Sequence, residues 1–244
     1  MRNLIVLSFL IILAFVSNLK AQNKILLSEF VVAPTVGEFV EIYNPGDSIV
    51  DLSNYYITDA TFQNGNTYFY QIVLRNNPEI QGGGGNFSDW HAKFPDGATI
   101  DPQEFQTISL NGSSNFFAEY GLNPTYELYE DSVSADTIPD MIEADSGSIN
   151  AQGGLTSAGE FLVLYYWDGN SDLVTDVDYI VWGDKVEAVD KSGIRIDGPD
   201  ADSDSSIYTN NIAISNQEVS PTHIFTTSAQ RIHFDEGTQT TKSR

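Results

Sequence analysis

Short runs of apolar side chains, many of them alternating with polar ones, recur along most of the chain and are separated by turn residues. Because successive side chains of a strand point to opposite faces, such runs predict β-strands with one or both faces buried. Short helices are predicted at residues 116–121, where Gly121 would end the helix, and around residues 139–144. The predicted strands cover residues 24–32, 38–43, 67–74, 105–110, 160–167 and 178–183.

Residues 37–59, GEFVEIYNPGDSIVDLSNYYITD, form the most regular part of this pattern. Two apolar runs flank the segment NPGDS, whose Pro fixes φ and whose Gly accepts positive φ, as tight turns require. We therefore predict a compact antiparallel unit whose acids, Glu38 and Glu41 among them, face solvent or pair with a basic neighbour. Its interior would consist of Val40, Ile42, Leu52, Tyr55 and Ile57.

Several segments resemble the lamin tail domain in the form found in secreted bacterial proteins. The resemblance rests on EFVEIYN, the NPG turn, the VDLS step and ITD within residues 38–59, and on VDYIVWGD at residues 177–184. It covers about residues 24–184, and the Ser-x-x-Arg pattern at residues 228–231 resembles the segment that completes the family's sheet. The resemblance implies an all-β, immunoglobulin-like β-sandwich that is not itself catalytic, here with long loop insertions and at most short helices.

The first residues are typical of a secretory signal peptide. Arg2 supplies a basic start, residues 4–16 are apolar, and Leu19-Lys20-Ala21 precedes an expected cleavage point. An uncleaved membrane anchor is the alternative, although this run of 13 residues is short against the roughly 20 needed to span a bilayer. We expect residues 1–21 to be removed and the protein to be secreted, periplasmic or at the cell surface, with no transmembrane segment left.

The length of the chain suits one domain over residues 22–244. Its core would cover about residues 24–184, interrupted by an acidic insertion at about residues 122–159. A polar extension follows at residues 191–244. The chain has no cysteine, so disulfides do not contribute to its stability, and the fold must depend on its apolar core.

The charge of the chain limits its partners. The formal net charge is −23, and after cleavage nine basic residues would remain against 34 acidic ones. Such a surface repels phosphates, so nucleic acid is excluded as a partner, while cations and basic partners are favoured. General solubility of an exported protein is the simpler explanation of the same charge.

Two acidic loops predict calcium binding. In the first, oxygen ligands stand at positions 1, 3, 5 and 9 of a potential calcium loop. Position 6 is Leu173 rather than Gly and position 12 is Tyr179 rather than Glu, so the loop is not an EF-hand. The expected ligands of the first loop are Asp168, Asn170, Asp172 and Asp176, and those of the second are Asp197, Asp200, Asp202 and Asp204. Solvated Asp/Ser turns are the alternative explanation for both loops.

The sequence contains no recognisable catalytic motif. Its three histidines, at positions 91, 223 and 233, form no HExxH pattern, and no G-x-S-x-G segment is present. We therefore expect a non-enzymatic interaction or adhesion module, with an unknown protein or glycan as partner and no cofactor requirement other than the candidate calcium. Its binding surface would be formed by residues 122–159 and the Asp-rich loops.

Two other functions remain open from the sequence. One is a calcium-assisted carbohydrate-binding module, in which exposed Trp90, Trp167 or Trp182 would stack on sugar rings. A place for these three side chains in the core or at its rim is the alternative. The other function is a hydrolase with an unrecognised acidic site. A catalytic pair could be drawn from the 34 acids, but for that reason no particular pair is persuasive.

Overall fold

The computed structural model describes residues 25–61, 67–74, 83–84, 89–131, 136–220 and 227–234. The predicted signal peptide lies outside the described residues. In the part of the chain that is described, no helix combines the length and the apolar character needed to cross a membrane.

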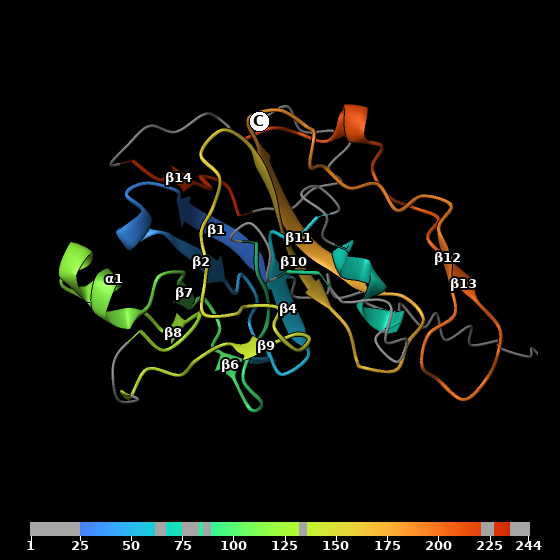
Figure 1. The fold of residues 1–244 in the computed structure, drawn as a ribbon, viewed down its shortest axis with the longest axis horizontal. Coiled ribbons are helices and arrows are strands. Elements are labelled where there is room, and N and C mark those ends of the chain that lie inside the picture. The colour runs from blue at the N-terminus through green and yellow to red at the C-terminus, as the bar shows by residue number, and fades with distance from the viewer. Residues whose placement is uncertain are drawn as a thin grey trace, which may run out of the picture.

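Two five-stranded sheets form the body of the protein (Figure 1). The first has the order β14-β1-β2-β7-β8 and the second the order β11-β10-β4-β5-β9. Neighbouring strands are antiparallel except β7 and β8, which are parallel. The first sheet consists of β1 (Leu26–Val31), β2 (Phe39–Tyr43), β7 (Phe105–Ser109), β8 (Tyr126–Glu127) and β14 (Ala229–Gln230). The second consists of β4 (Tyr55–Thr58), β5 (His91–Lys93), β9 (Ile142–Glu143), β10 (Glu160–Tyr166) and β11 (Thr175–Trp182).

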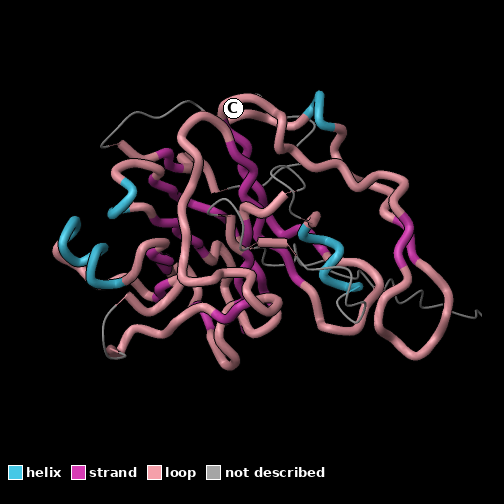
Figure 2. The backbone as a smooth tube through the Cα atoms, viewed as in Figure 1, coloured by secondary structure: helices cyan, strands magenta, loops and turns pink. Residues whose placement is uncertain are grey.

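Shorter elements surround the two sheets, and loops account for much of the periphery (Figure 2). Figure 1 shows α1 and the β12–β13 hairpin at opposite ends of the molecule. These shorter elements confirm the prediction of an all-β protein with short helices only. They are β3 (Val50–Asp51) paired with β6 (Thr99–Ile100), β12 (Arg195–Ile196) paired with β13 (Ser206–Ile207), α1 (Ser113–Tyr120), η1 (Thr35–Gly37), η3 (Phe69–Leu74) and η4 (Ile214–Asn216).

The main core lies between the two sheets. Val40 and Ile42 of β2 and Ile57 of β4 are fully buried there, as their alternating pattern predicts. Trp182 packs on Phe30 with the ring centroids 4.7 Å apart. Burial of each such side chain stabilises the fold by roughly 1.5–3 kcal/mol relative to exposure.

Strand β10 is buried on both faces, which explains its continuous apolar run. Leu162 and Leu164 join the core between the sheets, whereas Phe161, Val163 and Tyr165 face a second core on the opposite side. Covering side chains of the second core come from η3 and from residues 188–208, among them Phe69, Ile72, Val189, Ile196 and Tyr208. The sandwich therefore carries a third layer over part of one face.

Three predicted elements are wrong. The predicted strand at residues 67–74 is the 3-10 helix η3, and the helix predicted around residues 139–144 is replaced by strand β9. Residues 37–59 do not form one antiparallel unit, because β2 pairs with β1 and β7 while β4 pairs with β10 and β5. The apolar faces of β2 and β4 meet across the core instead, which satisfies the same alternation of side chains.

The acidic insertion at residues 122–159 is built into the sandwich. It contributes β8 to the edge of the first sheet and β9 to the edge of the second. Backbone bonds join residues 139 and 141 to Glu127 of β8, immediately before the chain enters β9. The side chains that the insertion adds to the main core are Tyr126, Leu128, Met141, Ile149 and Leu155.

One buried ion pair joins the two sheets at the opposite edge. Arg231, which follows β14, donates from Nη2 to Oδ2 of Asp178 on β11 at 2.6 Å and from Nε to the Leu27 carbonyl at 3.0 Å. The same Asp178 oxygen accepts the Leu27 N–H at 2.8 Å, where the register between β1 and β2 shifts. The Ser-x-x-Arg segment thus completes the first sheet as predicted, and its arginine also contacts the second.

Candidate functional site

The structure brings three of the eight predicted calcium ligands together. Asp172 comes from the turn between β10 and β11, while Asp197 and Asp200 come from the loop between β12 and β13. One carboxylate oxygen from each of the three lies within 4.8 Å of the other two. The two loops that the sequence presents as separate candidates therefore form one acidic cluster, the loop cluster.

Backbone contacts fix the geometry of the loop cluster. The Gly198 N–H donates to Oδ1 of Asp172 at 2.8 Å, and this bond, with a smaller contribution from Ser206, lowers the pKa of Asp172. Partial desolvation and the neighbouring carboxylates, Asp202 first among them, raise the pKa of Asp200. A cation bound at the loop cluster would relieve the repulsion between these carboxylates.

Gly198 makes the approach of the two loops sterically possible. A Cβ added at this position would lie 2.7 Å from Cα and 2.9 Å from the backbone nitrogen of Asp172. We predict that Gly198→Ala forces the loops apart and lowers the free energy of unfolding by about 1–3 kcal/mol. Urea unfolding measures this change, with Ser203→Ala in the same loop as the control. A Gly198→Ala midpoint equal to the wild-type midpoint would contradict the assignment.

The remaining predicted ligands have other surroundings. Oδ1 of Asp168 accepts the N–H groups of Asn170 at 2.9 Å and Ser171 at 2.7 Å, so Asp168 stabilises its own turn. Asn170 is exposed within this turn. Asp176 forms an ion pair with Lys191. In the second loop, the backbone N–H groups of Asp202 and Asp204 donate to the carboxylates of Asp200 and Asp202, respectively, in successive local turns.

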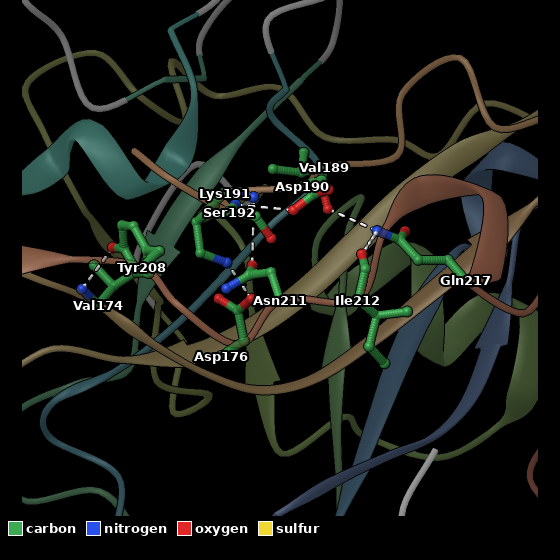
Figure 3. A network of polar contacts seen from close by, with 10 residues as sticks. All are labelled: Val174, Asp176, Val189, Asp190, Lys191, Ser192, Tyr208, Asn211, Ile212 and Gln217. Carbon is green, nitrogen blue, oxygen red and sulfur yellow. Dashed lines mark hydrogen bonds and ion pairs between the residues drawn. The ribbon is translucent and has the colours of Figure 1, made fainter. Parts of the chain in front are cut away.

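Lys191 anchors the C-terminal extension to the sandwich through the polar network drawn in Figure 3. Its side chain is 2 % exposed, and its ammonium lies 5.2 Å from the ring centroids of both Phe69 and Tyr208. The Tyr208 hydroxyl accepts the Val174 N–H at 3.0 Å, which ties the extension to the start of β11. The sequence gives no signal for this role, because a single lysine in a polar stretch predicts an exposed side chain.

The polar network of Figure 3 continues to Gln217. Nε2 of Gln217 donates to the carbonyl of Val189 at 2.8 Å and to that of Ile212 at 3.0 Å. These bonds close residues 189–217 into a compact segment. The loop cluster is thus carried by a segment that is packed on the sandwich.

A second acidic site, the acidic pocket, is formed by residues at the ends of β2, β4, β5 and β10 and by the end of the insertion. Four carboxylates, from Glu38, Asp59, Asp89 and Glu160, line a cavity of about 210 Å³. All four residues are buried, none of the described lining residues is basic, and Leu155 is the one aliphatic lining residue. The other lining residues are Thr35, Gly153, Gly154 and Thr156.

The expectation that Glu38 faces solvent or a basic neighbour is wrong. Its residue is 3 % exposed, and its Oε2 accepts the Leu155 N–H at 3.1 Å. Leu155 belongs to the insertion, which covers this end of β2 and which no short-range sequence pattern places there. Glu41 is half-buried and accepts the hydroxyl of Ser28 at 2.8 Å.

Burial raises the pKa values of three carboxyl groups in the acidic pocket. Desolvation raises the pKa of Glu38 to about 7, and desolvation together with the neighbouring Glu187 raises that of Glu160 to about 9. The pKa of Asp59 is raised well above its usual range by burial, Glu160 and Asp89. Oε1 of Glu160 has no hydrogen-bond partner among the described residues. The pocket can therefore hold protons at neutral pH, which solvent-exposed carboxyl groups ordinarily release.

The two facing, mainly antiparallel sheets, with acidic loops outside them, define an all-β protein of the immunoglobulin-like sandwich class. The chain belongs to the lamin tail domain family, whose model matches residues 18–203. Domains of this family are generally non-catalytic. A search of curated proteins gave no match.

Among solved structures, the chain is similar to the crystal structure of a DUF4876 family protein from Bacteroides thetaiotaomicron VPI-5482. The two sequences are 16 % identical, and the TM-score is 0.43. The similarity covers 65 % of this chain and 53 % of the other, so the chain spans about half the length of that protein.

Proposed function

We propose that this chain is an exported, non-catalytic interaction module in which loops, rather than a sheet face, carry the ligand site. The observation that carries the proposal is the convergence of Asp172, Asp197 and Asp200 from two separate loops into one partly exposed cluster. The leader-like pattern of residues 1–21 supports export, and the family supports a binding role without turnover. A surface of this charge favours a partner with a basic patch.

A calcium-assisted carbohydrate-binding module is the second candidate, and the spacing of the loop cluster favours the calcium part. Calcium binds oxygens at 2.3–2.6 Å, so oxygens around one ion lie within about 5 Å of one another, as they do here. The tryptophans do not favour the carbohydrate part. Trp90, Trp167 and Trp182 are each at most 1 % exposed and fill the two cores, so none of them offers a stacking surface.

Calorimetry with calcium chloride on the mature chain tests the ion at the loop cluster. We expect Asp197→Asn to weaken calcium binding by on the order of tenfold or more, because it removes one of three charged ligands. Asp101→Asn, which neutralises an exposed aspartate outside the cluster, is the matched control and should leave the titration unchanged. Equal calcium titrations for the wild type and Asp197→Asn would show that the loop cluster does not bind calcium.

Arrays of glycans and of extracellular proteins test the binding function itself. A ligand captured by the wild type and lost by the double variant Asp197→Asn/Asp200→Asn supports recognition through the loops. Equal capture by the variant would place the binding surface elsewhere. Mass spectrometry of the captured ligand after incubation tests the non-catalytic part, and a cleaved ligand would overturn it.

A further inference from the structure

A second group of converging carboxylates lies far from the loop cluster, where the insertion meets helix α1 at the other end of the molecule (Figure 1). Glu127 belongs to β8, and Glu130 and Asp136 follow it in the insertion. One oxygen from each of these three carboxylates lies within 4.8 Å of the other two. Neither short sequence patterns nor the resemblance to the family draws attention to these residues.

Specific hydrogen bonds hold the three carboxylates in place. At the first residue of α1, the Ser113 N–H donates to Oε2 of Glu127 at 2.6 Å, and the Ser113 hydroxyl donates to Oδ2 of Asp136 at 2.7 Å. The Asp136 N–H donates to Oε2 of Glu130 at 3.0 Å, and the Ile138 N–H donates to Oδ1 of Asp136 at 2.5 Å. The group is thus arranged before any ligand arrives, which lowers the entropic cost of binding one.

One oxygen of the group has no partner, although it is inaccessible to solvent. Glu127 is fully buried, and its Oε1 accepts no hydrogen bond from the described residues. The ion pairs of the described chain, formed by Lys93, Lys191 and Arg231, lie elsewhere. A buried carboxylate with one unpaired oxygen and no ion pair is costly unless a cation binds it, so this position of Glu127 favours a positively charged ligand.

We propose that Glu127, Glu130 and Asp136 bind a calcium ion. All three offer carboxylate oxygens, which hard cations prefer, and their mutual distances match the roughly 5 Å spread of oxygens around one calcium ion. Magnesium requires near-ideal octahedral geometry and retains most of its water, which suits a partly buried, irregular group less well.

The ion would connect three parts of the chain. Glu127 lies in the edge strand β8, Ser113 starts α1, and Glu130 and Asp136 belong to the insertion, so coordination would join helix, sheet and insertion at one point. This role is structural and separate from ligand recognition at the loop cluster. It does not depend on the proposed function.

Calcium titrations of the full mature chain by calorimetry test the proposal, with Glu130→Gln/Asp136→Asn as the test variant. Both positions are at least partly exposed, so these near-isosteric changes should leave the fold intact, as circular dichroism can verify. We expect the variant to lose one calcium equivalent, or to bind it about tenfold or more weakly, and to lose the corresponding rise in Tm. Glu119→Gln, an exposed acid on α1, should behave as the wild type.

Variants of the loop cluster separate the two sites. Asp172→Asn/Asp197→Asn should leave the calcium equivalent of Glu127, Glu130 and Asp136 in place, because the two groups lie at opposite ends of the molecule. Unchanged calcium binding by Glu130→Gln/Asp136→Asn overturns the proposal, even where the loop cluster binds calcium. A wild-type chain that binds no calcium at millimolar concentration overturns it as well. If the double variant does not fold, Asp136→Asn alone gives the same test.

Discussion

Replacing Arg231 with methionine should lower the free energy of unfolding by about 3–5 kcal/mol, since it removes one partner of a buried ion pair. The side chains of Arg231 and Asp178 are 7 % and 2 % exposed, so the remaining Asp178 carboxylate would stay buried without a counter-charge. The variant would also lose the bond from Arg231 to the Leu27 carbonyl, which helps to hold β14 to β1. Urea unfolding followed by fluorescence of the buried tryptophans measures the loss.

Two further variants identify the cause of that loss. Asp178→Asn in the Arg231→Met background removes the unpaired charge but keeps an acceptor for the Leu27 N–H, so it should restore part of the stability. Lys93→Met breaks a pair whose aspartate, Asp96, is 80 % exposed, and it should cost less than about 1 kcal/mol. Equal losses for Arg231→Met and Lys93→Met would show that the link between the sheets contributes little.

Replacing Glu160 with glutamine should stabilise the protein at alkaline pH, by on the order of 2–4 kcal/mol at pH 8. Desolvation and Glu187 raise the pKa of Glu160 from its ordinary value of 4.5 to about 9 in the folded chain. The folded state therefore holds a proton that the unfolded state releases above pH 4.5. Glutamine fills the same space and needs no such proton, so the variant avoids this loss of stability.

The same linkage sets the pH dependence of the wild type. A carboxyl whose pKa is raised on folding favours the folded state at low pH, and this contribution is lost as the pH rises through the folded value. With folded pKa values of about 7 for Glu38 and about 9 for Glu160, stability should fall between about pH 4.5 and 9. Thermal unfolding across this range measures the slope, with the exposed Glu119→Gln as control. A Glu160→Gln variant with the wild-type slope would contradict the assignment.

Much of the fold follows from local alternation of apolar and polar residues. Residues 161–165 are apolar or aromatic without alternation, because β10 is covered on both faces. The interior positions Val40, Ile42 and Ile57 were likewise predictable, although their strands belong to different sheets. Alternation specifies which face of a strand is buried, but it does not specify which strand lies beside it.

The sites depend on contacts between residues distant in sequence, which limits what the sequence predicts. Both halves of the loop cluster could be found because each contains several acids at short spacing. That Asp172 meets Asp197 and Asp200 follows from the packing of residues 189–217, which depends on the isolated Lys191. The burial of Glu38 could not be predicted from its neighbours in sequence, because it is covered by Leu155, which lies more than a hundred residues later.

The insertion has a consequence for how the protein avoids self-association. Exposed edge strands can pair with strands of other molecules, which leads to aggregation. Here β8 and β9 are edge strands of opposite sheets, and the chain passes from one to the other with backbone bonds to Glu127 on the way. At the other edge, Arg231 joins β14 and β1 to β11. Both open sides of the sandwich are thus bridged, an arrangement that opposes edge-to-edge polymerisation.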